Sequence, residues 1–575
     1  MKASDFIARF LEKQNVTHVF ELSGGMITHI LDSLYELGTI KIVSMHHEQC
    51  ASLAADGWAR VKGIPGVALA TSGPGATNLI TGIGSCYFDS VPAVFITGQV
   101  NQHEQKGERA IRQLGFQETD IISVSKPLTK AAIQVQNVEE LPAILIRAFS
   151  IALSGRPGPV LIDIPMNLQR ADVPEQDIPF VQPTEMGLNK LSNNLWLELK
   201  TMLKSAKRPM ILAGRGVLSA FARKEFLAFV ERTGVPVITS LMAVDAIPYN
   251  HPLRVGYIGA YGNRWANLAI GECDCMLVIG SRLDIRQTGA DVKGFKGNKI
   301  IYHVDVEEAE INNRLTGCVP VVTDVKTFLQ TALTVWSGEN FPPYMEWYSQ
   351  IESLRKRWPD IDENVCIKGI NANAFMHRLS QLAKNADAYL ADVGTHQMWA
   401  AQSLEIKEGQ WFLTSGGMGA MGFALPAAIG ACFGLNERPV VAIIGDGSMQ
   451  LNIQELQTIV RNKLPVKIVV INNRSLGMIR QFQDSYFDSK YQSTMWGYDA
   501  PDFEKVSQAY GIDATTISDK ESIEEGLRQL WKDAAKPFLL QVMIDPHANA
   551  YPKIAFGKPI TEMEPFAKPI EMEGT

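Results

Sequence analysis

The chain has 575 residues, of which 46% are hydrophobic and 20% are charged, and its formal net charge at pH 7 is -7. These are ordinary values for a globular protein, and the length predicts about three or four domains, or fewer if they are large. A negative charge balance without a long basic run argues against nucleic acid or an anionic membrane as a partner.

The N-terminal residues and the cysteines indicate a cytoplasmic protein. The first residues include an acid and lack the apolar core of a signal peptide, and no window approaches the length of a membrane span. The seven cysteines are scattered, and the close pair Cys273 and Cys275 has a spacing that fits neither a zinc knuckle nor a redox Cys-x-x-C motif. We therefore expect free thiols in a reducing cytoplasm.

Apolar strands alternate with helical segments in the first part of the chain. An amphipathic helix is predicted at residues 6–11, followed by strands at 16–20, 67–71, 93–97 and 160–163. Such alternation is typical of a parallel sheet with helices on both faces. We assign residues 1–170 to an N-terminal domain and interpret the polar stretch 172–194 as a linker.

The same rhythm returns twice. Strands at 209–213, 236–239, 275–280 and 299–306 predict a central domain over 190–335, followed by a second linker at 338–343. Strands at 388–392, 440–444, 466–471 and 537–544 predict a C-terminal domain over 363–547 and an irregular tail over 548–575. The expected fold class is α/β with three doubly wound parallel-sheet domains. The first and third have similar length and rhythm, which is consistent with two related α/β domains.

The most informative segment runs from residue 445 to residue 473. Gly445 opens a loop after the buried strand 440–444, at the edge where open α/β sheets bind ligands. Asp446 and Asn473 end successive strands, so both side chains would reach one Mg²⁺, and the glycines would let the backbone approach a diphosphate. A plain βαβ turn is the alternative. The later Asn-Asn pair disfavours it, because Gly-Asp-Gly followed by Asn-Asn resembles the thiamin diphosphate fingerprint.

A second candidate, Glu48, stands where an apolar strand gives way to a helix of small residues. Alone, it is explained as an acidic residue favoured by the helix dipole. Thiamin, however, is deprotonated by its own 4′-amino group, which becomes basic enough only when a carboxyl group holds a proton at N1′ of the pyrimidine. We predict that Glu48 is this carboxyl group, so that Glu48 and Asp446 hold opposite ends of one cofactor.

The chain resembles the large catalytic subunits of the acetohydroxyacid synthase (acetolactate synthase) family over nearly its full length. The matching stretches are 71–78, 115–120, 155–160, 415–423, 445–459 and 472–478. The resemblance implies a pyruvate oxidase/decarboxylase-like architecture and an active site shared between subunits, hence a homodimer or homotetramer. It also implies that Phe116 and Gln117 face the substrate from the partner subunit and that Met421 forces the cofactor into its bent form. Ordinary core packing is the alternative for Phe116 and Met421.

The resemblance extends to the residues around the cofactor. Mg²⁺ would be held by Asp446, Asn473 and the backbone carbonyl of Ser475. Thiamin diphosphate would be surrounded by Gly25, Glu48, Pro74, Asn78, Gly394, Thr395, His396, Gln397, Gly419, Met421, Gly445, Asp446, Gly447, Ser448, Asn473 and Met478.

The central domain resembles the flavin-binding members of this family. A Gly-x-Gly after a strand is weak by itself, but residues 280–289 are close to the family pattern Gly-x-Arg-Phe-Asp-Asp-Arg-x-Thr-Gly. Strand-end carboxylates can accept from a ribose or an adenine, and arginines suit phosphate or isoalloxazine oxygens. The implied FAD site comprises Arg156, Gly214, Arg215, Gly216, Gly280, Arg282, Asp284, Arg286, Asp305 and Asp324. Because decarboxylation and ligation are redox-neutral, such a flavin would be structural.

Three departures from the family pattern concern the acceptor substrate. The polar loop 101–115 is longer than expected, although a tolerated surface insertion would explain it. Phe482 stands where these synthases carry a tryptophan that favours 2-ketobutyrate. Residues 260–262 and 22–25 also differ. This pattern is similar to flavin-containing carboligases of branched-sugar (yersiniose-type) pathways.

The leading hypothesis is a thiamin diphosphate-dependent carboligase that decarboxylates pyruvate and transfers the two-carbon acetyl unit to a ketone or 2-keto acid, with a nucleotide-linked keto-deoxysugar slightly favoured. The alternative within this class is an acetolactate synthase of branched-chain amino acid synthesis. A pyruvate oxidase that uses the flavin for electrons, and a non-enzymatic nucleotide-binding regulator, are the other classes considered. The glutamate and the Asp446–Asn473 pair disfavour the regulator.

Overall fold

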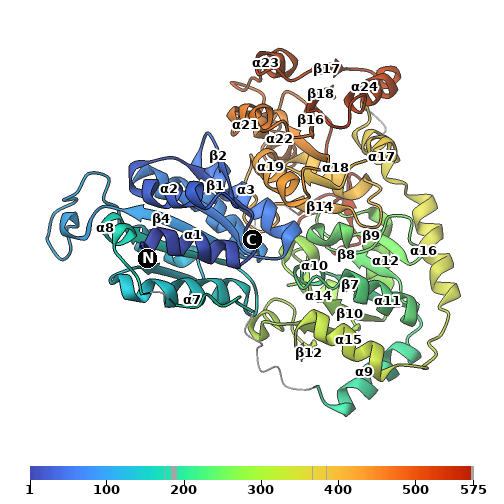
Figure 1. Cartoon of the computed structure of the whole chain (residues 1–575). Helices are drawn as coiled ribbons and strands as arrows, with labels where there is room; N and C mark the ends of the chain where they lie inside the picture. The colour runs from blue at the N-terminus through green and yellow to red at the C-terminus, as the bar shows by residue number, and fades with distance from the viewer. Residues whose placement is uncertain (175, 183–190, 365–366, 384, 571–575) are drawn as a thin grey trace.

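Three large parallel sheets, each flanked by helices, make up most of the computed structural model (Figure 1). The structure describes residues 1–174, 176–182, 191–364, 367–383 and 385–570. The predicted start of the central domain at residue 190 and the end of the predicted tail, 571–575, lie outside these residues. The expected fold class, α/β with three parallel sheets, is confirmed.

The first sheet has the strand order β2-β1-β3-β4-β6-β5. Strands β3, β4 and β6 are buried along their whole length, as expected for parallel strands covered on both faces. The strands are β1 His18–Leu22, β2 Lys41–Ser44, β3 Gly66–Ala70, β4 Ala93–Gln99, β5 Ala131–Gln134 and β6 Pro159–Pro165. The helices are α1 Ala3–Lys13, α2 Thr28–Leu37, α3 Glu48–Lys62, α4 Pro74–Asn78, α5 Ile80–Asp89, α6 Ile121–Ser125, α7 Leu141–Leu153 and α8 Met166–Arg170.

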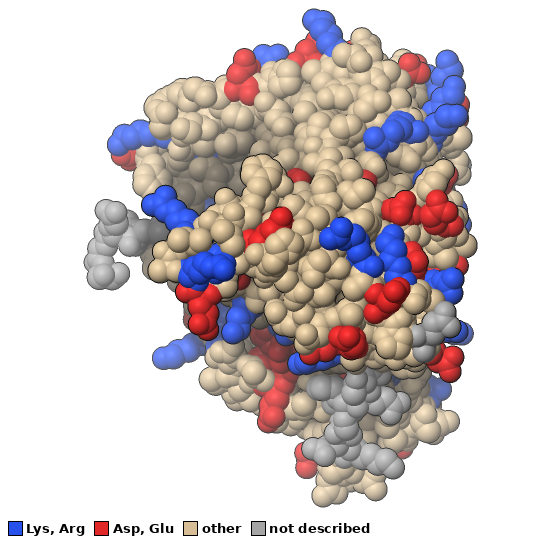
Figure 2. All heavy atoms as spheres, turned by 60° about the vertical axis from the view of Figure 1, so that its left-hand side comes forward, with Lys and Arg blue, Asp and Glu red and all other residues tan. Residues whose placement is uncertain are grey.

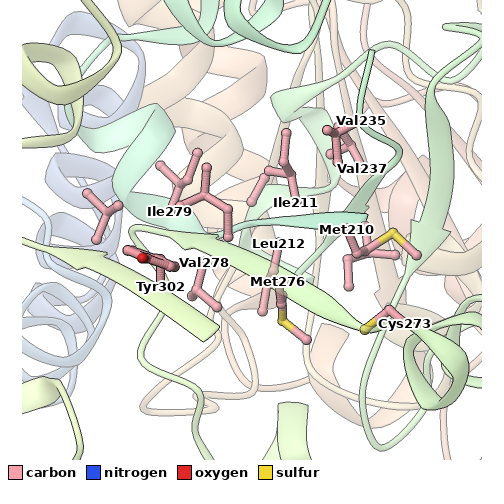
Figure 3. Close-up of a cluster of buried hydrophobic side chains, with 14 of the residues drawn as sticks. Met210, Ile211, Leu212, Val235, Val237, Cys273, Met276, Val278, Ile279 and Tyr302 are labelled. Atoms are coloured by element: carbon pink, nitrogen blue, oxygen red, sulfur yellow. The ribbon is translucent and has the colours of Figure 1, made fainter. Parts of the chain in front are cut away.

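The central sheet has the order β12-β11-β10-β7-β8-β9. Its strands β7 and β10 send apolar side chains to both faces, where they pack under the covering helices (Figure 3). The strands are β7 Pro209–Ala213, β8 Val237–Thr239, β9 Arg254–Tyr257, β10 Cys275–Ile279, β11 Ile300–Asp305 and β12 Val319–Val322. The helices are α9 Asn193–Ser205, α10 Arg215–Ser219, α11 Arg223–Thr233, α12 Arg264–Glu272, α13 Ile285–Thr288, α14 Val292–Lys296 and α15 Val325–Val335, and α16 Met345–Arg357 leads to the third domain.

The third sheet has the order β14-β13-β15-β16-β18-β17, which repeats the order of the first sheet strand for strand. The strands are β13 Ala388–Ala391, β14 Trp411–Thr414, β15 Val440–Gly445, β16 Val466–Asn472, β17 Ala514–Ile517 and β18 Phe538–Met543. The helices are α17 Ala372–Leu382, α18 Thr395–Ser403, α19 Ala424–Gly434, α20 Asp446–Met449, α21 Leu456–Asn462, α22 Gly477–Tyr486, α23 Phe503–Ala509 and α24 Ile523–Leu530.

Helices α3 and α19 hold the first and third domains together. A Cβ added to Gly57 would lie 2.2 Å from the carbonyl oxygen of Ala427, and one added to Gly430 would lie 1.8 Å from that of Ala54. Both glycines are therefore required for the close approach of the two helix backbones. The apolar residues around this crossing form one core cluster that spans both domains.

The C-terminal segment is not wholly irregular, so the predicted tail needs correction. Strands β19 Lys553–Ile554 and β20 Met563–Glu564 form a short antiparallel pair. Ile554, Ile560 and Met563 belong to the apolar core of the central domain, and the Arg264 guanidinium donates to the carbonyl oxygen of Glu564 at 2.9 Å. Only a few apolar side chains of the tail are buried, and they pack against another domain. The tail sequence therefore has no regular apolar pattern from which these two strands could be predicted.

The surface carries charged side chains of both signs (Figure 2), and the cysteines of the described residues are buried. Figure 2 shows acidic and basic side chains interspersed on the face that it presents, without a continuous basic patch. In the described part of the chain, no helix is long and apolar enough to cross a membrane. Six cysteines there are buried and free.

Candidate active site

Glu48 lies at the carboxyl edge of the first sheet, as the first residue of α3. Its side chain is 7% exposed, and its Oε2 accepts a hydrogen bond of 2.9 Å from Nδ2 of Asn78, at the end of α4. A Cβ added to Gly75, beside Pro74, would lie 3.4 Å from Glu48 Oε1. The structure thus brings the predicted residues Glu48, Pro74 and Asn78 together, and the amide of Asn78 orients the carboxyl group.

The loop after β4 carries the residues predicted to face the substrate. Gln117 has φ +66° and lies beside Gly73, because a Cβ added there would be 3.1 Å from Gln117 Cβ. The side chain of Phe116 is 80% exposed, so core packing within this chain does not explain it. Gly25, also predicted, opens the short 3₁₀ helix η1 (Gly25–Ile27), whose Met26 N–H donates to Thr71 Oγ1 at 3.3 Å.

Helix N-termini gather at the carboxyl edge of the third sheet. Helix α18 begins after Gly394 and α22 after Leu476, and neither has a side-chain cap. Their first N–H groups lack intrahelical acceptors, which favours an anionic group at this edge. The short α20, which also follows a strand, begins at Asp446 between them.

Asp446, Asn473 and Ser475 meet at this edge. Asp446 is 2% exposed, burial raises its pKa to about 6, and its Oδ2 accepts from the Tyr498 hydroxyl at 2.9 Å. Asn473 Oδ1 accepts from the Ser475 N–H at 3.2 Å. Ser475 Oγ is buried without a hydrogen-bond partner among the described residues. Oxygen atoms of this kind, with one lacking a partner, fit a hard cation such as Mg²⁺ together with a diphosphate.

Glycines make room for backbone and ligand around α20. A Cβ added to Gly447 would lie 2.6 Å from Leu476 Cδ2 and 3.5 Å from Met421 Cε, so Met421 reaches the start of α20. One added to Gly477 would lie 3.1 Å from Thr395 Cγ2. Two further predicted residues lie close by in the sequence. Gly419 is in the stretch 415–424 that contains Met421, and Met478 is next to Gly477 at the start of α22.

Three residues of α18 and α20 that were predicted to bind the cofactor form hydrogen bonds with other groups of the protein. His396 Nε2 accepts from the Gly445 N–H at 3.1 Å, and burial lowers the pKa of His396 to about 3, so its ring is neutral. Gln397 Nε2 donates to Thr414 Oγ1 at 2.6 Å. Ser448 Oγ donates to the carbonyl oxygen of residue 393 at 3.2 Å. These contacts fix the edge that the helix N-termini form.

A cavity of ≈ 450 Å³ lies where all three domains meet. Of the ten residues predicted to bind FAD, nine line it: Arg156, Arg215, Gly216, Gly280, Arg282, Asp284, Arg286, Asp305 and Asp324. The tenth, Gly214, is not among the residues that line the cavity. A Cβ added to it would be 2.1 Å from the carbonyl oxygen of Gly280, so the turn between β7 and α10 packs directly on Gly280.

The charges of this cavity fit a dinucleotide. Arg215 Nε and Nη1 are buried without hydrogen-bond partners in the described part of the chain, and burial lowers the pKa of Arg215 to about 10. A guanidinium in this state is stabilised by an anion such as a phosphate. Burial also raises the pKa of Asp305, at the end of β11, to about 6, so it can accept from or donate to a ribose or adenine group.

Other predicted residues of the cavity already have partners within the protein. Arg156 Nη1 pairs with Glu307 Oε2 at 2.9 Å and with Glu310 Oε1 at 2.7 Å. Asp284 and Asp324 cap the N-termini of α13 and α15. These side chains shape the cavity wall whether or not they touch a ligand.

Sequence reasoning missed four polar residues at the two sites. Asp392 follows β13 and accepts from the N–H groups of Gly422 and Ala424 at 2.9 and 2.7 Å. Its place at a strand end was a usable signal. Tyr498 lies far along the chain from Asp446, and the cavity residues Arg60 and Asp89 lie within helices. Nothing local in the sequence distinguished these three.

The two predicted ends of the cofactor site lie at the edges of two different sheets of the chain. Among the hydrogen bonds and ion pairs of the described residues, none links Glu48 to Asp446 or Asn473. The two edges are separately formed, one on each of two sheets with the same strand order.

Three family models match the chain in order. They are the N-terminal TPP binding domain of thiamine pyrophosphate enzymes over residues 1–124, their central domain over 198–332 and their C-terminal TPP binding domain over 392–542. Fold and site therefore define a thiamin diphosphate-dependent enzyme.

Similar proteins narrow the class further. The probable acetolactate synthase large subunit of Methanocaldococcus jannaschii is 36% identical over 100% of this chain and 96% of its own length. The acetolactate synthase large subunit of Porphyra purpurea is 37% identical over 97% and 94%, and the isozyme 3 large subunit of Escherichia coli 34% identical over 98% of each chain. The chain belongs to the acetolactate synthase large-subunit family. It is a thiamin diphosphate-dependent carboligase, and thiamin diphosphate, Mg²⁺ and FAD are the cofactors of its family.

Proposed function

We propose that the chain is the catalytic subunit of an acetolactate (acetohydroxyacid) synthase, which decarboxylates pyruvate and joins the two-carbon unit to a second 2-keto acid. The observation that carries this proposal is the similarity to acetolactate synthases over 97–100% of the chain. It replaces the keto-deoxysugar as the favoured acceptor, because that acceptor has no support among these relatives.

The proposed roles follow from the two sheet edges. Glu48, oriented by Asn78 at 2.9 Å, holds a proton at N1′ of the cofactor pyrimidine. Asp446, Asn473 and the carbonyl of Ser475 hold Mg²⁺, and the uncapped starts of α18 and α22 receive the diphosphate. When bound, thiamin diphosphate supplies the electron sink that decarboxylation requires.

We propose further that two copies complete each site, as a homodimer or within a homotetramer. The support is that Phe116 is 80% exposed on one chain and that Glu48 has no link to Asp446 within it. A partner copy would cover Phe116 and place Phe116 and Gln117 beside the substrate.

The FAD proposed for the central cavity has a structural role, because the reaction is redox-neutral. The buried, unpartnered Arg215 nitrogens support an anionic ligand there. The purified protein should be yellow, and anaerobic pyruvate should leave its flavin spectrum unchanged. Bleaching by pyruvate would instead indicate a pyruvate oxidase.

A keto-deoxysugar nucleotide is the second candidate acceptor, and the side chain at position 482 favours it. Phe482 in α22 is 37% exposed, and its ring lies 4.7 Å from that of Tyr486, where the family tryptophan would occupy more space. Residues 107–114 of the long loop after β4 are also exposed.

One experiment separates the two acceptors. Purified enzyme is supplied with pyruvate alone, with pyruvate plus 2-ketobutyrate, and with pyruvate plus a 4-keto-deoxysugar nucleotide, and the products are identified by mass spectrometry. We expect acetolactate and acetohydroxybutyrate. An adduct with the sugar alone would overturn the proposed acceptor while leaving the carboligase class intact.

A further inference from the structure

The segment of residues 415–424 runs from the end of β14 to the first residue of α19, and it connects the two cofactor sites of one chain. Gly416 and Gly417 line the central cavity. Met421, a few residues later, reaches the start of α20, because its Cε lies 3.5 Å from a Cβ added to Gly447. A single short stretch of backbone therefore forms part of the cavity wall at one end and presents Met421 to the third-domain edge at the other.

Asp89, the last residue of α5, fastens the cavity end of this segment. Its Oδ1 accepts from the Gly417 N–H at 2.7 Å and its Oδ2 accepts from the Gly416 N–H at 3.1 Å. The residue is 5% exposed and also lines the cavity. Asp89 belongs to the first domain, so the hydrogen bonds cross from that domain to the third.

Arg60 of α3 completes the anchor. Its Nη2 donates to Asp89 Oδ2 at 2.9 Å, and its Nη1 donates to the carbonyl oxygen of Thr414 at 2.9 Å. Asp56 holds the same guanidinium through Nε and Nη2, at 2.5 and 3.1 Å. Arg60 lines the cavity as well, so both residues of the anchor belong to the cavity wall. Removing one partner of such a buried pair is costly, because the other charge stays buried.

Separate contacts hold the far end of the segment. Asp392 accepts from Gly422 and Ala424, and Asn452 Nδ2 donates to the Gly422 carbonyl at 2.7 Å. These residues belong to the third domain itself. Between the two anchors, Gly419 has φ +67°, a conformation that a glycine adopts at little cost. The position of Met421 thus depends on one anchor within its own domain and one at the cavity wall.

We propose that Asp89 is a positioning residue that couples the central cavity to the thiamin diphosphate site. A flavin nucleotide packed against Arg60, Asp89 and the 416–417 backbone holds residues 415–424 in the conformation that presents Met421. FAD binding and thiamin diphosphate binding then strengthen each other, as linkage requires. The inference rests on the proposed function only in that FAD occupies the cavity and thiamin diphosphate the third-domain edge. Under this proposal, a flavin that transfers no electrons acts by holding residues 415–424 in place.

The test is a pair of binding titrations on the protein freed of both cofactors. Thiamin diphosphate with Mg²⁺ is titrated with and without saturating FAD, and FAD is titrated with and without saturating thiamin diphosphate. We expect each to tighten the other by the same factor, about five-fold or more. Hydrogen–deuterium exchange of residues 415–424 should slow when FAD alone is added.

The informative variant is Asp89→Asn. Its amide nitrogen would face an N–H donor on one side, so the variant keeps the size of Asp89 but loses part of the anchor. We expect FAD still to bind and the coupling to fall to about two-fold or less. The matched control is Asp245→Asn, which changes another buried aspartate near the cavity. Asp245 pairs with Arg223 at 2.7 Å and has no hydrogen bond to residues 415–424 in the described structure, so the coupling should persist.

The outcomes separate the coupling from the cofactor assignment. Independent binding of FAD and thiamin diphosphate to the wild-type protein, or full coupling in Asp89→Asn, would overturn the role of Asp89. Failure of FAD to bind the wild-type protein at all would overturn the cofactor assignment and the coupling with it. The wild-type titrations need no variant, so the proposal remains testable even if Asp89→Asn does not fold.

Discussion

The first and third domains have the same strand order and different chemistry. Counted along the chain, each sheet runs 2-1-3-4-6-5. The carboxyl edge of the first sheet presents a carboxyl group, Glu48, held by Asn78. The corresponding edge of the third sheet presents Asp446, Asn473 and uncapped helix N-termini. The comparison teaches that topology determines where a ligand binds, while the residues at the strand ends determine which part of the ligand is held.

The repeat also explains how the two domains pack. Helix α3 follows the second strand of the first domain, and α19 follows the second strand of the third, so the two helices are equivalent. Each carries a glycine against an alanine of the other: Gly57 against Ala427 and Gly430 against Ala54. The contact is nearly self-complementary, like an interface between two identical subunits.

The largest expected effect concerns the first-domain edge. Glu48→Gln should lower kcat by about 10²–10⁴-fold and leave the affinity for thiamin diphosphate nearly unchanged, because glutamine keeps the size but not the proton of the acid. Steady-state rates and a cofactor titration measure both quantities. The matched control is Glu21→Gln, another buried carboxyl group of this domain, whose Oε1 accepts from Ser44 at 2.5 Å. A loss below about tenfold in Glu48→Gln would remove Glu48 from its role.

Substitutions at the third-domain edge should change the affinity for the cofactors rather than the rate of the chemical step. Asp446→Ala should weaken Mg²⁺ and thiamin diphosphate binding by more than about 100-fold, with partial recovery of activity at high cofactor concentration. Tyr498→Phe, which removes only the hydroxyl that donates to Asp446, should weaken binding by about 10–100-fold. Isothermal titration measures both. Unchanged binding together with activity that no cofactor concentration restores would contradict the metal assignment.

A smaller effect is expected at the acceptor side of the third domain. Phe482→Trp fills space beside the proposed site, so it should raise the preference for 2-ketobutyrate over pyruvate by up to about 1–3 kcal/mol and lower ligation to bulky ketones. Competition between the two keto acids, followed by product analysis, gives the ratio. Phe487→Trp, a neighbouring ring 5.7 Å away, is the control and should leave the ratio unchanged. Equal shifts in both variants would mean that position 482 does not select the acceptor.

The smallest effect concerns the pH dependence of stability. It involves two histidines that do not occupy equivalent positions in the first and third domains. Burial opposes the charge of His377 in the third domain, but the hydrogen bonds that its ring donates to the carboxylates of Asp360 and Glu405 outweigh burial and raise its pKa. Its stabilising contribution is therefore complete below the unfolded pKa of 6.5 and is lost as pH rises through the folded pKa. Burial lowers the pKa of His18 in the first domain to about 4, so its contribution is lost as pH falls from 6.5 towards 4.

Thermal unfolding between pH 5 and pH 9 tests this sign difference. His377→Gln should remove part of the decline on the alkaline side, and His18→Gln should remove part of the decline on the acidic side. The same change in both variants would show that the two sites do not differ in charge.

The sequence predicted the buried strands of all three sheets and the edge strand β2, but it missed the other five edge strands. Central strands such as β10 and β15 are continuous apolar runs, which is why they were recognised. The strands that were missed, β5, β9, β12, β14 and β17, all lie at the edge of a sheet. Edge strands are short and pair on one side only, so they need no long apolar run.

The residues of the candidate site likewise fall into those that the sequence predicted and those that only the structure shows. Glu48, Asp446 and Asn473 follow strands, so a rule about strand ends located them. Arg60, Asp89 and Tyr498 act through contacts between residues far apart in the chain. Only the assembled domains show such contacts.

The central claim is that Glu48 of one copy and Asp446 of its partner act on the same cofactor, and mixing two inactive variants tests it most directly. Glu48→Gln and Asp446→Ala chains are co-expressed so that mixed dimers form, and carboligase activity is measured at limiting cofactor. If the sites are shared, one site of each mixed dimer carries both substitutions and the other carries neither, so about a quarter of wild-type activity should return. If each chain builds its own site, every site carries one substitution, and activity would stay at the level of the single variants.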